Sequence, residues 1–344
     1  MQRVADILTE WYRLHGRSLP WRETRDPYRI WLSEVILQQT RVAQGWDYYL
    51  RFTERFPDVA SLAAADEDSV LKLWQGLGYY SRARNLHAAA RQVMQEFEGR
   101  FPRTPEEVRS LRGVGDYTAA AICSLAYDLP CAVVDGNVYR VLSRLYDIEE
   151  PIDTAAGKKL FAELAQSCLG DAQPALYNQA IMDFGATLCT PAQPRCTECP
   201  LAEQCAARAA RTIARRPVKK GTTRVRDRRF HYLQIVCGGS TVLRRREAGD
   251  IWQGLYEFPL IESEMEAPEL YATEEFRRWV GPQGRVVARV DLPRHQLSHQ
   301  RLHATVYRIE VEAFTPAAAA CAVPLGQVGD YAVPRLIERY LLSK

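Results

Sequence analysis

A change in hydrophobic period divides this chain into two parts that cannot share one fold. Residues 1–205 follow a helical period, as in DEDSVLKLWQGLG (66–78), and strand signals there are scarce. Beyond a basic stretch the period becomes two. FHYLQIV (230–236) and TVLRRR (241–246) flank a GGS turn and predict a hairpin, and LHATVYRIEVEAF (302–314) predicts another strand. We therefore expect a mainly α N-terminal domain followed by a smaller α+β domain.

The stretch between the two parts is strongly basic. Residues 206–229 hold ten Lys or Arg against a single acid, Asp227. A solvated linker and a segment that follows a DNA backbone explain this composition equally well. We expect domains at residues 1–208 and 229–344, joined by a basic linker at residues 209–228.

The composition limits the classes of protein that need to be considered. A chain of 344 residues agrees with two domains, and a net charge of +3 means that any affinity for nucleic acid comes from local patches. The first residues lack the apolar core of a signal peptide, and no apolar run reaches the roughly 18 residues that span a bilayer. We expect an intracellular protein whose nine cysteines are reduced or bound to metal.

Four of the nine cysteines fall within seventeen residues, in CTPAQPRCTECPLAEQC. Their spacing is C-x6-C-x2-C-x5-C, and thiolates favour zinc or iron–sulfur clusters. The spacing alone leaves a four-thiolate zinc site and a 4Fe–4S cluster as comparable alternatives. The predicted metal ligands are Cys189, Cys196, Cys199 and Cys205. We expect packing roles for the other five cysteines, which are Cys123, Cys131, Cys168, Cys237 and Cys321.

The segment LRGVGDYTA (111–119) places Gly113 and Gly115 on either side of Val114, directly before an apolar helix. Two glycines permit a tight turn with unusual backbone angles, and amides at a helix start can bind a phosphate of DNA. An ordinary turn between helices explains the same motif equally well. Asp116 would oppose phosphate binding unless it points away or caps the helix.

Two acidic residues stand in apolar surroundings. Glu34 lies in IWLSEVILQQT (30–40), whose apolar side chains point nearly all round a helix, so we expect that helix to be buried. Asp135 follows an apolar run in AVVDGNVYRVLSRL (132–145) and precedes a helix, where a plain N-cap role is one interpretation.

Three motifs taken together resemble the fingerprint of the helix–hairpin–helix DNA glycosylase superfamily. They are L-x-G-V-G-x-x-T-A, then V-D-x-x-V-x-R-V about twenty residues later, then the four-cysteine loop at 189–205. The resemblance implies that this loop holds a 4Fe–4S cluster. Members that cleave the DNA strand carry a lysine where this chain has Tyr117, which cannot form a Schiff base. The resemblance therefore implies a monofunctional glycosylase that leaves an abasic site.

Within this superfamily the chain is similar to the MutY-type adenine DNA glycosylases over about 200 residues. The matching segments are LPWR (19–22), DPYRIWLSEVILQQTRV (26–42), WQGLGYYSRARNLH (74–87), VDGNVYRVLSR (134–144) and YNQAIMDFGATLCTP (177–191). Adenine is a poor leaving group unless it is protonated, and a carboxyl in a low-dielectric pocket keeps its proton near neutral pH. The resemblance implies that Glu34 protonates N7 and later activates a water, while Asp135 stabilises or traps the cationic sugar.

The resemblance assigns further roles around these two carboxyls. Tyr117 and Asn137 would line the adenine pocket beside Asp135, and Gln179 would read the edge of adenine. Trp21 and Arg22 would form the pocket wall. A base that leaves the duplex stack must be replaced by something in the gap. The residues implied to fill the stack and hold the opposite base are Gln39, Thr40, Leu77 and Tyr79.

The C-terminal part is similar to the Nudix-related C-terminal domain of the MutY type, on the segment IWQGLYEFP (251–259). Nudix hydrolases hold magnesium with clustered glutamates, whereas the nearest segment here, EEFRRWV (274–280), carries bases and a tryptophan instead. Nucleotide hydrolysis is therefore disfavoured. In the family a Phe-Ser-His motif recognises 8-oxoguanine. Here Leu297 precedes Ser298 and His299, and leucine stacks on a base less well than phenylalanine does.

The leading hypothesis is a monofunctional DNA glycosylase of base-excision repair, which removes adenine opposite 8-oxoguanine or guanine and carries one 4Fe–4S cluster. We expect a monomer whose partner is double-stranded DNA with such a mispair, located in the cytoplasm at the bacterial nucleoid and away from membranes. Two alternatives stay open at this point. One is a glycosylase of thymine/guanine mismatches, and the other is a non-catalytic protein that binds damaged DNA.

Overall fold

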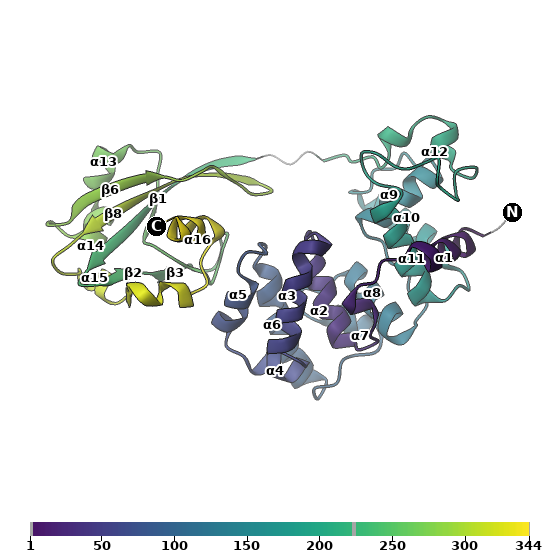
Figure 1. Ribbon diagram of the computed structural model, residues 1–344, viewed down its shortest axis with the longest axis horizontal. Coiled ribbons are helices and arrows are strands. Elements are labelled where there is room, and N and C mark those ends of the chain that lie inside the picture. The colour runs from purple at the N-terminus through teal and green to yellow at the C-terminus, as the bar shows by residue number, and fades with distance from the viewer. Residues whose placement is uncertain (1–2, 222–224, 344) are drawn as a thin grey trace. The chain divides into compact units, whose positions relative to one another are not determined.

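The computed structural model describes residues 3–221 and 225–343, which form two compact units (Figure 1). The first unit comprises residues 1–64 and 85–221, and the second comprises residues 65–84 and 222–344. The boundary near residue 222 falls inside the predicted linker, whose residues 222–224 lie outside the described part of the chain. The predicted domain boundaries at 208 and 229 stay a prediction.

The described part of the first unit is built from helices. Its elements are α1 (Val4–His15), η1 (Pro20–Arg22), α2 (Pro27–Leu37), α3 (Val42–Arg55), α4 (Val59–Ala64), α6 (Ser81–Glu96, whose first turn belongs to the second unit), α7 (Pro105–Ser110), α8 (Asp116–Tyr127), α9 (Gly136–Leu145), α10 (Ala155–Leu169), α11 (Pro174–Thr187), α12 (Ala206–Ala209) and η2 (Ile213–Arg215). The mainly α character predicted for this part is confirmed.

The helix α2 is buried on nearly every side, as its apolar pattern predicts. Asp26 caps its N-terminus by accepting a hydrogen bond from the backbone N–H of Tyr28 at 2.9 Å, and Pro27 takes the first helical position. The helix packs against α3 and α8. Trp31, one of its side chains, is 1% exposed, and full burial of a large apolar side chain contributes about 1.5–3 kcal/mol.

A second group of helices forms the other half of this unit. The helix α11 packs against α1, α8 and α9, as Figure 1 also shows for α1. Apolar side chains from these helices, among them Val138, Phe161 and Phe184, belong to one buried cluster. The polar residues described below come mainly from α2, from α11 and from the starts of α8 and α9.

The second unit contains α5 (Glu67–Trp74), the first turn of α6 and the C-terminal sheet. The strands are β1 (Arg226–Cys237), β2 (Ser240–Val242), β3 (Arg244–Arg245), β4 (Tyr256–Glu257), β5 (Leu260–Glu262), β6 (Arg285–Asp291), β7 (His295–Gln296), β8 (Gln300–Glu310) and β9 (Ala322–Pro324). The helices after β5 are α13 (Ala267–Tyr271), α14 (Glu274–Val280), α15 (Pro316–Ala319), η3 (Leu325–Asp330) and α16 (Arg335–Leu342).

The main sheet has the order β6-β8-β1-β2-β9, with β5 also paired to β1 and β7 to β8. The long strands β1 and β8 run parallel, from the pair Arg226–Gln300 to the pair Val236–Glu310. Apolar side chains of the sheet face α16 and η3 in one cluster and α13–α15 in another. This is the α+β character that the sequence predicts for the C-terminal part.

The predicted hairpin is present but shorter than its apolar pattern suggests. β1 and β2 pair around Gly238 and Gly239, which have positive φ angles of 52° and 82°. The second strand ends at Val242, because Arg244 and Arg246 turn to the buried carboxylate of Glu257 and β3 pairs with β4 instead. The other predicted strand, 302–314, runs from 300 to 310.

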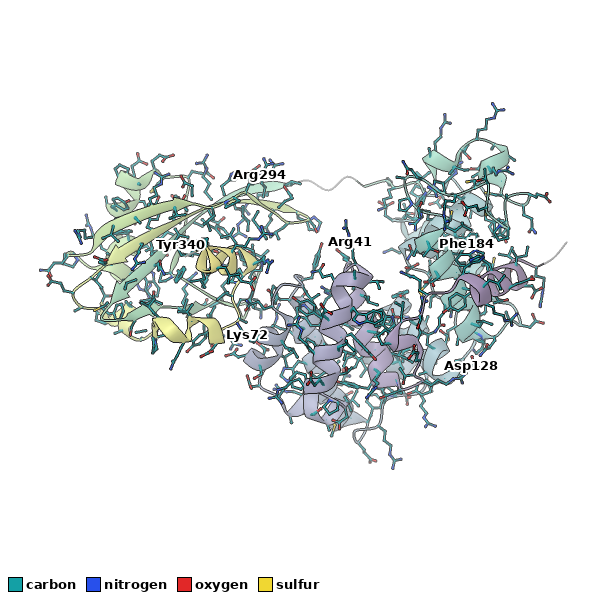
Figure 2. All side chains as sticks on the ribbon, in the orientation of Figure 1. Arg41, Lys72, Asp128, Phe184, Arg294 and Tyr340 are labelled. Carbon is teal, nitrogen blue, oxygen red and sulfur yellow. The ribbon has the colours of Figure 1, made fainter. Side chains whose placement is uncertain are left out.

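The helix α5 is held by hydrogen bonds to the C-terminal part of the second unit. Lys72, which is labelled in Figure 2, donates to the backbone oxygens of Gly329 at 2.5 Å and Tyr331 at 3.1 Å. The hydroxyl of Tyr256 donates to Asp68 at 2.8 Å. The segment 65–84, which has a helical pattern, thus packs with the sheet whose first strand begins only at Arg226. In the described part of the chain, no helix combines the length and apolarity needed to cross a bilayer.

Candidate active site

A cavity of about 440 Å³ lies in the first unit, between η1, α2, α8, α11 and the start of α9. Eight of the residues singled out from the sequence line it: Trp21, Arg22, Glu34, Thr40, Tyr117, Asp135, Asn137 and Gln179. They come from segments as far apart in the chain as residues 21 and 179. The fold therefore brings together the residues that the resemblance assigns to catalysis and to an adenine pocket, and it places Thr40 of the stack-filling group beside them.

Glu34 is the buried acid of this cavity, with 8% of its surface exposed. The hydroxyl of Tyr117 donates a hydrogen bond to its Oε2 atom at 2.6 Å. Burial raises the pKa of Glu34 to about 7, and the charge of Asp135 acts in the same direction, whereas the Tyr117 hydrogen bond and Arg22 lower that pKa. A carboxyl with this pKa can both donate and accept a proton near neutral pH.

Asp135 is the N-cap of α9 and also lines the cavity. Its Oδ1 accepts hydrogen bonds from the backbone N–H groups of Asn137 at 2.9 Å and Val138 at 2.8 Å. Its Oδ2 accepts one from the side-chain amide of Asn137 at 2.7 Å. Burial raises the pKa of Asp135, and these hydrogen bonds oppose the rise. The N-cap role inferred from the sequence is confirmed, and it leaves the carboxylate beside the cavity.

Arg22, in the wall of the cavity, is held by Asp183, a residue that the sequence reasoning missed. Asp183 is fully buried and accepts hydrogen bonds from Arg22 at 2.7 and 2.8 Å and from the backbone N–H of Arg17 at 2.9 Å. These partners outweigh its burial and lower the pKa of Asp183 to about 2. Trp21 packs edge-on against Tyr49 in the same wall.

The signal that could have found Asp183 was present in the sequence. Like Glu34, it is an acid within an apolar helical run, YNQAIMDFGAT, four residues after Gln179. Tyr12 was missed as well, because a tyrosine in the amphipathic helix α1 carries no such signal. Its hydroxyl donates to Oε1 of Gln179 at 2.9 Å.

The predicted phosphate-binding hairpin precedes α8. Gly113 has a φ of 78°, and a Cβ atom there would come within 2.6 Å of the Cβ of Asn85, so this position requires glycine. Gly115 has a φ of −101°, and a Cβ atom there would meet nothing within 4 Å, so of the two glycines it is Gly113 that the turn requires. Val114 between them is buried. Asp116 forms an exposed ion pair with Arg109 at 2.9 Å, which offsets its charge.

The four clustered cysteines surround one small cavity. Cys189, Cys196, Cys199 and Cys205 line a space of about 30 Å³ together with Leu188 and Ile213. Arg144 donates to the sulfur of Cys189 at 3.5 Å, and burial raises the pKa of the Cys199 thiol to about 11. Four thiols that converge on one space fit an iron–sulfur cluster, whose cationic iron would keep them deprotonated.

Among residues 3–221 and 225–343, no group of three or more His, Cys, Asp or Glu side chains is placed to hold a metal ion. The choice of a 4Fe–4S cluster for this loop therefore rests on the family resemblance. Arg140 joins this loop to the first cavity, since it donates to the backbone oxygen of Cys189 at 2.7 Å and to Oδ1 of Asn137 at 2.8 Å.

The remaining predicted DNA-contact residues divide between the two units. In the second unit, Leu77, Tyr79, Leu297, Ser298 and His299 line one cavity of about 420 Å³. The hydroxyls of Tyr79 and Ser298 share a hydrogen bond. Tyr79 is 45% exposed, whereas Leu77 is 7% exposed.

In the first unit, Gln39 is exposed and follows Gln38, the C-cap residue of α2. Its φ is 55°, in the left-handed region that few residues other than glycine adopt. Tyr79 of the second unit has a φ of 45°. Backbone held in this region costs about 1–3 kcal/mol per residue and tends to occur at functional sites.

Comparison with known proteins assigns both parts of the chain. The model of the HhH-GPD superfamily base excision DNA repair proteins matches residues 32–167, and the NUDIX domain model matches residues 231–343. The adenine DNA glycosylase of Buchnera aphidicola (subspecies Baizongia pistaciae) is 32% identical over 302 residues, which cover 87% of this chain and 83% of that protein. The chain belongs to the adenine DNA glycosylase family.

Mammalian relatives match this family member over a shorter region. The adenine DNA glycosylase of Mus musculus is 45% identical over 220 residues, 59% of this chain and 42% of the mouse protein. The human protein is 44% identical over 211 residues. The chain thus spans less than half the length of these curated relatives.

Solved structures confirm the fold of the helical part. A thermostable thymine-DNA glycosylase superposes with a TM-score of 0.56 and 28% identity, over 60% of this chain and 95% of that one. A trapped covalent endonuclease III–DNA intermediate superposes with a TM-score of 0.53 and 22% identity, which supports the fold alone. The predicted superfamily and fold class are therefore confirmed.

Proposed function

We propose that this family member is a monofunctional DNA glycosylase of base-excision repair that removes adenine mispaired with 8-oxoguanine or guanine. The observation that carries the proposal is the meeting of Glu34 and Asp135 in one cavity with different environments. One carboxyl has a pKa near 7 and can act as an acid, while the other is held by three hydrogen-bond donors. Glycosidases use the same division between two carboxyl groups.

The reaction follows from this division. Glu34 donates its proton to N7 of adenine as the bond between C1′ and N9 breaks, and the bonding electrons leave with the base. Positive charge then develops on the sugar, and the carboxylate of Asp135 stabilises it or adds to C1′. Glu34, now deprotonated, takes a proton from the water that attacks C1′, which leaves an abasic site. Tyr117 has no amine that could form a Schiff base, so no strand cleavage follows.

The other cavity residues would hold the flipped base. Gln179 would read the edge of adenine, with Trp21, Arg22 and Asn137 around the ring. Moving a base out of the duplex stack costs a few kcal/mol of free energy, so side chains that fill the vacated gap are needed. Gln39, Thr40, Leu77 and Tyr79 would fill this gap and hold the opposite base.

Recognition of the oxidised base is assigned to the second unit. We infer that Ser298 and His299 contact 8-oxoguanine, with Leu297 in place of a stacking aromatic side chain. The partner would be duplex DNA with an adenine:8-oxoguanine mispair, bound by a monomer at the bacterial nucleoid. The hairpin from Gly113 to Gly115 would hold a backbone phosphate at the start of α8.

The cofactor of the proposal is one 4Fe–4S cluster. Cys189, Cys196, Cys199 and Cys205 would hold it, and Arg144 would offset the charge of the thiolates. The cluster would stabilise the loop at 189–205. That loop contacts the catalytic cavity through Arg140.

A second candidate is excision of thymine from thymine/guanine mismatches. The likeness to a thymine-DNA glycosylase, at 28% identity and a TM-score of 0.56, favours it. The NUDIX-like residues 231–343 favour adenine instead, since the match to that structure covers only 60% of this chain. A non-catalytic damage-binding role would leave the perturbed pKa of Glu34 without use.

One experiment separates these functions. Labelled duplexes with adenine opposite 8-oxoguanine, adenine opposite guanine, and thymine opposite guanine are incubated with excess protein, with and without hot alkali. We expect breaks that depend on alkali at adenine alone, fastest opposite 8-oxoguanine. Excision of thymine alone would replace the proposal with the second candidate. Tight binding without any excision would favour the damage-binding role.

A further inference from the structure

A chain of hydrogen bonds behind the first cavity connects two helices to Gln179. Asp183 and Gln179 lie one turn apart on α11, and Tyr12 lies near the end of α1. Arg22 donates to Asp183 at 2.7 Å and to the hydroxyl of Tyr12 at 3.3 Å. Tyr12 in turn donates to Oε1 of Gln179 at 2.9 Å. Tyr12 and Asp183 are not among the residues that line the cavity.

The direction of these hydrogen bonds follows from the chemistry of each group. The Asp183 carboxylate can only accept, and the Arg22 guanidinium can only donate. The hydroxyl of Tyr12 therefore accepts from Arg22, and in the structure it donates its single proton to Oε1 of Gln179. An amide that receives this proton must present its oxygen to Tyr12. Its NH2 group then lies at the opposite edge of the planar amide, away from Tyr12.

Gln179 is the member of this chain that lines the cavity. We propose that Tyr12 is a positioning residue that fixes the amide of Gln179 with its NH2 group toward the cavity, so that the site selects a base with a ring-nitrogen acceptor. This inference rests on the proposed excision of adenine. Because Glu34 is assigned to N7, the acceptor for Gln179 would be N1 or N3.

This arrangement explains why the amide needs support. The oxygen and nitrogen of a glutamine amide exchange places by rotation, so a free side chain would present either group to the base. A hydrogen-bonding site rejects a base that lacks the matching group, because the site's polar atom is then left unpaired. Asp183 completes the support, since it holds Arg22 where the guanidinium meets Tyr12.

The test removes one hydroxyl from the protein and one nitrogen from the base. Tyr12→Phe is compared with the wild-type protein in single-turnover excision of adenine, 1-deazaadenine and 3-deazaadenine, each opposite 8-oxoguanine. We expect Tyr12→Phe to slow adenine excision about tenfold, as the loss of one oriented hydrogen bond would. One of the two deaza bases lacks the nitrogen that accepts from Gln179. On that base we expect Tyr12→Phe and the wild-type protein to have the same excision rate.

Two controls separate positioning from general damage. Tyr28→Phe also removes one buried hydroxyl, whose hydrogen bond runs to the backbone oxygen of Phe56 at 2.8 Å, and it should not change the rate on any of the three bases. Gln179→Ala should excise adenine slowly. The double variant with Tyr12→Phe should excise adenine at the same rate as Gln179→Ala alone.

The outcomes discriminate clearly. If Tyr12→Phe slows excision of all three bases equally, or does not slow excision of adenine, the inference is overturned. The proposed function still stands in that case, provided that the wild-type protein excises adenine. A wild-type protein that leaves adenine in place would overturn both.

Discussion

The helices α2 and α11 each carry a buried carboxyl group near the cavity, Glu34 on α2 and Asp183 on α11. The pKa values of these two groups move in opposite directions. Burial raises the pKa of Glu34 to about 7, because one phenol is its only close hydrogen-bond donor in the described contacts. Burial acts on Asp183 in the same sense, but Arg22 and Arg17 lower its pKa to about 2. Burial alone thus does not decide whether a carboxyl can work as an acid, whereas its partners do.

The largest effect that we predict tests the catalytic half of this comparison. Glu34→Gln keeps the shape of the side chain but removes the proton that would go to adenine. We expect single-turnover excision to fall by about 10²–10⁴-fold, the usual range for a general acid, with affinity for the mispaired duplex retained. Excision at the wild-type rate would show that Glu34 is only a buried structural acid.

The structural half of the comparison is tested at Asp183. Asp183→Asn leaves two arginines without their shared carboxylate, and the loss of one partner of a buried pair costs about 3–5 kcal/mol. We expect this decrease in the free energy of unfolding in urea. Asp6→Asn, which removes an exposed ion pair with Arg3, is the matched control and should change it by less than about 1 kcal/mol. Equal effects of the two substitutions would contradict the role of Asp183.

The raised pKa of Glu34 also has a cost in stability, which appears as the pH rises above about 4.5. The group binds its proton more tightly in the folded protein, so folding is favoured at low pH and loses stability as the pH rises from about 4.5 to about 7. Since one pH unit corresponds to about 1.4 kcal/mol, the loss approaches roughly 3 kcal/mol above pH 7. Glu34→Gln should therefore raise the melting temperature at pH 8 more than at pH 5. If the melting temperature rises equally at pH 5 and pH 8, the pKa of Glu34 lies near its ordinary range instead.

The smallest effect extends the comparison to cations in the basic linker. Arg216 is 5% exposed and pairs with Asp147 and Glu149 at 2.8 Å each, so it is structural. Its neighbours Arg215, Lys219 and Lys220 are exposed. If these three contact DNA phosphates, their joint replacement by glutamine should reduce the slope of log affinity against log salt by about 0.9 per lost contact. An unchanged slope would leave the linker as a spacer.

The sequence predicts much of the proposed catalytic cavity, because its residues occupy local motifs. Glu34 in an apolar helix and Asp135 before another helix were found in this way, as was the four-cysteine loop. Asp183 could have been found by the same reasoning as Glu34. Tyr12 could not, because its role depends on the side-by-side packing of α1 and α11, which no local pattern encodes. The early end of β2 likewise depends on a distant partner, Glu257.

The packing of the segment 65–84 with the C-terminal sheet has a consequence for how this chain can be divided. The polypeptide passes between its two units at residues 64–65, 84–85 and 221–222, so a single cut at the linker separates neither unit cleanly. A fragment that ends at residue 221 would keep α5 but would lose the groups that bind Lys72 and Asp68. Exchange of the C-terminal region between relatives would thus have to carry residues 65–84 along, and the two stretches are expected to change together in evolution.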